Sequence, residues 1–166
     1  MSSHNIDSSG ATFEDLAIDD TLTDLERVVR YVHSNIALQR VIHVRMLEET
    51  AVAAGSVLPR QIPHVAAYPA LYDSFEKTVE AIVPVLEPLV SDAEFVVRQH
   101  LAGQFPGLCK HLVESGGDVG YKLVLDKMFC VPEFISLAGD PVFRVRKAIA
   151  LNCVQVCTIA GPVVTE

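Results

Sequence analysis

The sequence predicts an all-α protein built from stacked, antiparallel pairs of helices. The first observation is an internal repeat, because a pattern of Pro, Asp and Val-Arg starting at Pro84 returns 48 residues later at Pro132 with the same internal spacing. The second is that apolar residues in both copies recur with the period of an α-helix. The third is that no alternation of period two persists along the chain. A repeat of this length is typical of stacked supersecondary units.

Each copy of the repeat predicts two helices joined by a tight turn. In the first copy, Pro84 lies within an apolar helix and predicts a kink, since proline removes a backbone hydrogen bond. Asp92 precedes a new helical run and is placed to cap it. That run has apolar residues at spacings of 4, 4, 3 and 4, namely Val97, Leu101, Phe105, Leu108 and Leu112. The second copy has the same stripe, namely Val145, Ile149, Cys153, Val156 and Ala160.

The rest of the chain divides around these copies. Residues 1–20 are acidic and serine-rich and predict a flexible tail. Residues 21–55 form a degenerate first repeat, with a capping box of Thr23 and Glu26. Its helices are expected at residues 24–33 and 36–54. A proline-rich loop at 56–70 leads to repeats at 71–114 and 118–161, which together give one repeat domain over 21–166.

Turn and end signals define the third repeat. Ser115-Gly-Gly-Asp118 predicts a turn, and a helix is expected from Gly120 to Ala138 with a kink at Pro132. Pro141 suits the first turn of the last helix, which Gly161 ends. Sliding the pattern back to the first repeat aligns Ser34 with the aspartates and Arg40 with the arginines. No polar unit closes the array, so we expect a fragment of a longer array or an end covered by a partner.

The repeated pattern resembles the HEAT repeat, with its kinked helix, turn aspartate and Val-Arg start of a second helix. The resemblance covers at least Val83 to Ala160 and implies a short α-solenoid of about three helix pairs. In HEAT arrays the aspartate and arginine form a hydrogen-bonded ladder between adjacent repeats. By resemblance, this inter-repeat ladder consists of Asp92, Arg98, Asp140 and Arg146. The alternative is that both arginines are simply solvated.

A second resemblance concerns the partner. Residues Leu22–Ala51 resemble the N-terminal repeat of the protein phosphatase 4 regulatory subunit 1 family, and the scaffold subunit of protein phosphatase 2A shares the repeat type. The resemblance implies a non-catalytic scaffold that holds a serine/threonine protein phosphatase catalytic subunit. The turns between paired helices are the expected contact regions, with Glu94 and Arg144 as candidate partner contacts. Phe95 and Phe143 are expected to pack inward.

Composition excludes several classes. A net charge of −8 argues against a nucleic-acid surface. No apolar run approaches the roughly 20 residues of a membrane helix. Four Cys without disulfide-rich spacing fit a reducing compartment. These features predict a cytoplasmic, or alternatively nuclear, protein that does not bind membranes.

No grouping of residues predicts catalysis, a metal or a cofactor. His111 and Glu114 are spaced as a possible ligand pair, but one pair does not make a site, and a solvated helix end is the expected reading. Cys109, Cys153 and Cys157 are expected to be core thiols. HEAT-like di-iron hydroxylases use His-Glu dipeptides, and no His here is followed by Glu. The alternatives to a phosphatase scaffold are a generic HEAT adaptor and, with less support, a HEAT-type enzyme.

Overall fold

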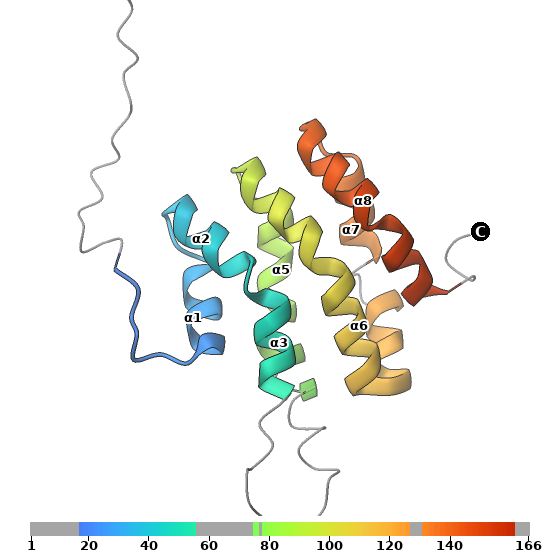
Figure 1. Ribbon diagram of the computed structural model, residues 1–166, viewed down its shortest axis with the longest axis horizontal. Helices are drawn as coiled ribbons and strands as arrows, with labels where there is room; N and C mark the ends of the chain where they lie inside the picture. Colours follow the sequence, from blue (N-terminus) through green and yellow to red (C-terminus); the bar gives the residue numbers. More distant parts are fainter. Residues whose placement is uncertain (1–16, 56–74, 77, 127–130, 162–166) are drawn as a thin grey trace, which may run out of the picture.

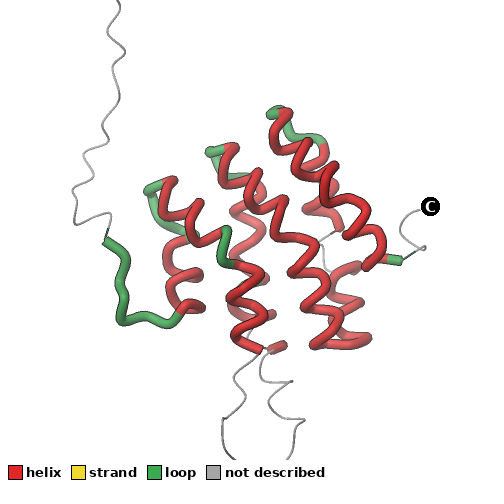
Figure 2. Tube along the Cα trace, in the orientation of Figure 1, coloured by secondary structure: helices red, strands yellow, loops and turns green. Residues whose placement is uncertain are grey.

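The computed structural model describes residues 17–55, 75–76, 78–126 and 131–161. Every regular element within these residues is a helix, and no strand occurs among them (Figure 2), which confirms the predicted all-α class. Most of the predicted tail at 1–20 and the predicted loop at 56–70 lie outside the described residues. The helices are α1 (Asp24–Tyr31), α2 (Ala37–Val44), α3 (Leu47–Gly55), α5 (Val83–Val90), α6 (Phe95–Asp126), α7 (Val131–Ala138) and α8 (Phe143–Ala160).

The helices lie side by side in a row, with α6 in the middle. Figure 1 shows α3, the first part of α6 and α8 as neighbours, with α5 and α7 behind them and α8 at the end of the row. Helix α6 contacts α2, α3, α5, α7 and α8. None of the described helices combines the length and hydropathy needed to span a membrane.

The predicted capping box starts α1. The Thr23 hydroxyl accepts a hydrogen bond from the Glu26 N–H at 3.4 Å, and the Glu26 carboxylate accepts one from the Thr23 N–H at 2.9 Å. Both bonds satisfy N–H groups that a helix start leaves unpaired. The helix ends at Tyr31, two residues before the predicted end.

The second predicted helix, 36–54, is divided into α2 and α3 around Arg45 and Met46. The Met46 N–H donates to the His43 carbonyl at 3.1 Å, so the last turn of α2 tightens before the break. No glycine or proline marks this position, and the prediction of one continuous helix is therefore wrong. The two helices pack separately against α1 and α6.

The helical segment before the turn at residues 91–94 is interrupted next to a proline. Residues 78–81 are helical, Ile82 breaks the run, and α5 then begins at Val83 with Pro84 in its first turn. Proline fits there because its missing N–H is not needed in a first turn. The predicted interruption is present, but it lies just before Pro84 and separates two helices. In the third repeat, α7 begins at Val131, next to Pro132, and residues 127–130 lie outside the described ones.

The predicted turn at Ser115–Asp118 reverses the chain within α6. Gly117 has φ 53° and ψ −131°, a backbone conformation that glycine adopts far more readily than other residues. A Cβ atom at Gly120 would lie 1.8 Å from the carbonyl oxygen of Leu112, so the returning helix can pass this close only without a side chain. The second part of α6 therefore lies behind the first (Figure 1).

The core follows the predicted stripes, with one exception. All five stripe residues of α6 are at most 1% exposed, and in α8 the stripe residues Val145, Ile149, Val156 and Ala160 are buried. Phe105 meets Phe134 of α7 edge to face, with ring centroids 5.9 Å apart. Cys153 is exposed, so its prediction as a core thiol is wrong. It lies at the edge of the stripe, where nothing described covers it.

Candidate protein-binding surface

Arg98 joins the turn before α6 to the turn before α8. Its Nε and Nη2 donate to the two carboxylate oxygens of Asp140 at 2.6 and 3.1 Å. Its Nη1 donates to the backbone carbonyl of Asp92 at 2.5 Å. The two side chains are only 12% and 5% exposed. This fork geometry is the strong form of an ion pair, because two charge-assisted hydrogen bonds fix both groups.

The same arrangement occurs one turn earlier along the row. Arg40 donates from Nε and Nη2 to Asp92 at 2.7 and 3.0 Å, and from Nη1 to the Ser34 carbonyl at 2.8 Å. The sequence pattern aligned Arg40 with Arg98 but did not include it among the ladder residues. The spacing within the repeat could have identified Arg40 as a ladder residue, since each of the three arginines follows its turn residue by six positions.

Arg146 occupies the third equivalent position and has the bonds to the backbone carbonyls of its turn, without the two bonds to a carboxylate. Its Nη1 donates to the Asp140 and Pro141 carbonyls of its own turn at 2.7 and 3.0 Å. In the part of the chain that the structure describes, no carboxylate lies within ion-pair distance of this guanidinium. The four predicted ladder residues thus lie along one series, in which Arg98 contacts Asp140, while Arg146 contacts no carboxylate of the described residues.

The paired aspartates also hold their turns. Asp92 accepts the Glu94 N–H, and Asp140 accepts the Val142 N–H, each at 2.8 Å. Both aspartates therefore stabilise the turn before the helix, whereas the prediction had Asp92 capping the helix directly. The hydrogen bonds from Arg98 and from the Val142 N–H hold the pKa of Asp140 below its ordinary value, against the opposing effect of burial. The Asp140 hydrogen bond raises the pKa of Arg98.

The two predicted partner contacts lie at neighbouring turns. Glu94 is exposed directly before α6. Arg144 is exposed in the first turn of α8, and its guanidinium carbon lies 5.9 Å from the ring centroid of Phe95. Phe95 is half-buried against the core, as predicted, whereas Phe143 is 62% exposed and the prediction that it packs inward is wrong.

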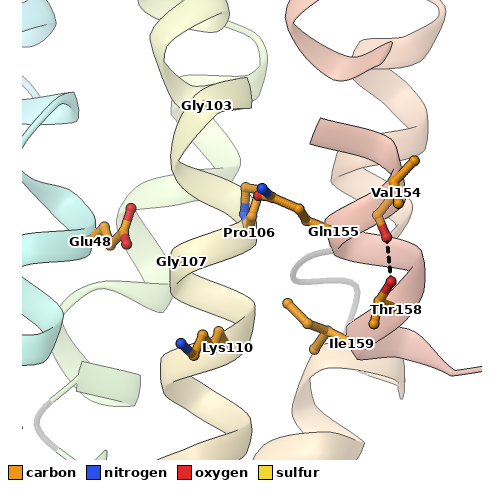
Figure 3. Close-up of a pocket in the computed structure, with 9 residues that line it drawn as sticks. All are labelled: Glu48, Gly103, Pro106, Gly107, Lys110, Val154, Gln155, Thr158 and Ile159. Carbon is orange, nitrogen blue, oxygen red and sulfur yellow. Dashed lines mark hydrogen bonds between the residues drawn. The ribbon is translucent and has the colours of Figure 1, made fainter. Parts of the chain in front are cut away.

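A groove of about 490 Å³ lies between α3, α6 and α8 (Figure 3). Glu48 of α3 reaches over Gly107, where a Cβ atom would lie 1.9 Å from the Glu48 carboxyl carbon. On the α8 side, the Thr158 hydroxyl donates to the Val154 carbonyl at 2.7 Å. The lining combines small and apolar residues with the opposite charges of Glu48 and Lys110, and it contains no His or Cys. The groove therefore offers a contact surface without a set of metal ligands.

The other candidate groups are dispersed. His111 is half-buried, so the prediction that it lies at a solvated helix end is wrong. Burial lowers the pKa of its imidazole. Cys109 is fully buried, as predicted. Cys153 is exposed and Cys157 is half-buried, with their sulfur atoms 3.8 Å apart, so the prediction of Cys157 as a core thiol is wrong as well. Within the described residues, no three His, Cys, Asp or Glu side chains are grouped to hold a metal.

Comparison with known proteins gives no relative: no model of a protein family, no curated protein and no solved structure matches this chain.

Proposed function

We propose that this chain is a non-catalytic HEAT-type scaffold that binds a serine/threonine protein phosphatase catalytic subunit. The observation that carries the scaffold is the repeated arginine–aspartate contact. Arg40 with Asp92, and Arg98 with Asp140, have the same atoms in contact and the same backbone carbonyl bond. Such repetition supports a short α-solenoid, because it stacks successive turns at one edge. Solenoids present extended surfaces for protein partners.

The phosphatase partner rests on the resemblance of Leu22–Ala51 to a phosphatase regulatory family. The proposed contact edge consists of the turns near 34–37, 91–95 and 139–143. Glu94 and Arg144 are the proposed contacts on this edge, since both side chains are exposed and carry charge. We propose that the chain itself has no hydrolase activity, because the sequence contains no catalytic grouping. The competing proposal is a generic HEAT-type protein–protein adaptor, and the three basic residues of α8, Arg144, Arg146 and Lys147, would suit an acidic partner.

The test is affinity purification with the full chain as bait, followed by mass spectrometry and a phosphatase assay on the eluate. We expect a serine/threonine phosphatase catalytic subunit to co-purify. Glu94→Arg and Arg144→Glu should reduce its recovery, whereas Lys122→Glu, an exposed position on the second part of α6, should leave it unchanged. Circular dichroism of each variant checks that the fold is retained.

Each outcome separates the competing proposals. If other proteins co-purify without any phosphatase subunit, the adaptor replaces the phosphatase scaffold. If the phosphatase is recovered and neither charge reversal lowers its recovery, the phosphatase remains the proposed partner and the proposed contact edge is rejected. Phosphatase activity of the purified chain alone would refute the non-catalytic role.

A further inference from the structure

One side of α8 corresponds, residue by residue, to a covered side of α6. Because the internal repeat is 48 residues long, each α8 residue has an α6 counterpart at the same helical angle. We call this side the α8 outer face. Its members are Phe143, Arg146, Ala150, Cys153, Val154 and Cys157, of which Val154 also borders the groove between α6 and α8.

The two sides differ sharply in exposure. On α6, the counterparts Ala102, Phe105 and Cys109 are 0% exposed, because α7 and α8 pack against this helix. On α8, Val154 is 75% exposed, whereas its counterpart Pro106 is buried. Phe143 is 62% exposed, and its counterpart Phe95 is half-buried. Cys153, the counterpart of Phe105, is also exposed. Figure 1 shows α8 at the end of the row, with no described helix beyond it.

The polar edge of this face indicates the chemistry of what would cover it. On α6, Arg98 directs Nε and Nη2 to the carboxylate of Asp140, which lies in the turn between the covering helices. On α8, Arg146 makes the equivalent bonds to its own turn through Nη1 and has no carboxylate partner among the described residues. The group that would give Arg146 the bonds of Arg98 is therefore an acidic side chain in a turn between two helices.

We propose that the α8 outer face binds a helical hairpin of another protein, whose turn presents an aspartate or glutamate to Arg146. The hairpin would cover Ala150, Cys153 and Val154 as α7 and α8 cover their α6 counterparts. This inference rests on the proposed role in binding proteins, but it does not require that the partner is a phosphatase or that the proposed contact edge binds it.

A second copy of this chain does not fit the face. From Phe143 to Ala160, α8 has three basic residues and no Asp or Glu, so two α8 helices brought together would repel each other and would offer Arg146 no carboxylate. The first repeat has Ser34 at the position of the turn aspartate and offers no carboxylate there. The α7–α8 hairpin of another copy is already packed on its own α6. The charge requirement thus selects a different, acidic partner.

The probe for this proposal is a synthetic peptide of residues 131–161, because this hairpin has the required turn aspartate. Cys153 and Cys157 of the peptide are replaced by serine, and a fluorophore is attached at its N-terminus. Fluorescence anisotropy with the full chain should show saturable binding. Arg146→Gln in the chain, or Asp140→Asn in the peptide, should weaken binding about tenfold or more, since each removes a charge-assisted pair. The matched control is Leu151→Ser, because Leu151 is 71% exposed but lies outside the face.

A second measurement keeps the test decisive if the free peptide does not fold. The same segment is joined to the end of the full chain by a Gly/Ser linker, which raises its effective concentration to about millimolar. Cys153 of the chain should then react with a maleimide at least about tenfold more slowly than in the unextended chain, since its counterpart on α6 is fully covered. Arg146→Gln should restore the rate.

The inference is rejected if the peptide shows no saturable binding and the extended chain shows no protection of Cys153. It is also rejected if Arg146→Gln has no effect, or if Leu151→Ser weakens binding as much as Arg146→Gln. Failure here with phosphatase recovered in the affinity purification would leave the proposed function intact. Binding of the hairpin without any phosphatase recovery would reject the proposed function and keep this inference.

Discussion

Replacing Arg98 by alanine tests the contact that repeats along the row. Arg98 donates two hydrogen bonds to Asp140 and one to the Asp92 carbonyl, and both charged side chains are nearly buried. A hydrogen bond to a charged group contributes roughly 1.5–3 kcal/mol, and stranding one charge of a fully buried pair costs about 3–5 kcal/mol. Because this pair retains slight solvent contact, we expect Arg98→Ala to lower the free energy of unfolding by about 2–4 kcal/mol.

Urea denaturation followed by circular dichroism measures this change. A loss of this size corresponds to a fall in melting temperature of roughly 4–16 °C for a chain of this length. Arg146→Ala is the matched control, since Arg146 has the same register and the same carbonyl bonds but no carboxylate partner among the described residues. It should cost less than about 1 kcal/mol. A double-mutant cycle of Arg98 with Asp140 should give a coupling of about 1 kcal/mol or more. Equal costs for Arg98→Ala and Arg146→Ala would refute the reasoning.

Two further predictions concern pH and the turn in α6. The pKa of Asp140 is lowered in the folded state, chiefly by the Arg98 hydrogen bond, so its contribution is fully present above the unfolded pKa and is lost as pH falls through the folded pKa. Urea titrations below pH 5 should therefore show a smaller acid-dependent loss in Arg98→Ala than in the wild type, and equal losses would contradict this. Gly117→Ala should destabilise the fold by about 1–3 kcal/mol, because φ 53° with ψ −131° strains any side chain. Gly103→Ala, on a helix surface with open space around it, should stabilise by about 0.4–1 kcal/mol in the same assay, and a loss at both positions would contradict this account.

Local sequence determined where the helices bury their faces and where the chain turns. The stripe from Val97 to Leu112 predicted five residues of α6 that are at most 1% exposed, since a period of 3.6 fixes which side chains share a face. The capping box at Thr23 and the glycine-rich turn at 115–118 also followed from short-range chemistry. These features depend on residues a few positions apart, which the sequence displays directly.

The tertiary structure decided which of those faces is covered and which charged groups meet. Arg40 reaches Asp92 across 52 positions, and Arg98 reaches Asp140 across 42, distances that periodicity within one helix does not encode. Cys153 and Phe143 match α6 residues in register, yet they are exposed because no described helix packs beyond α8. Burial depends on a neighbouring element as well as on a residue's own helix, and that neighbour is known only when the helices are placed in space.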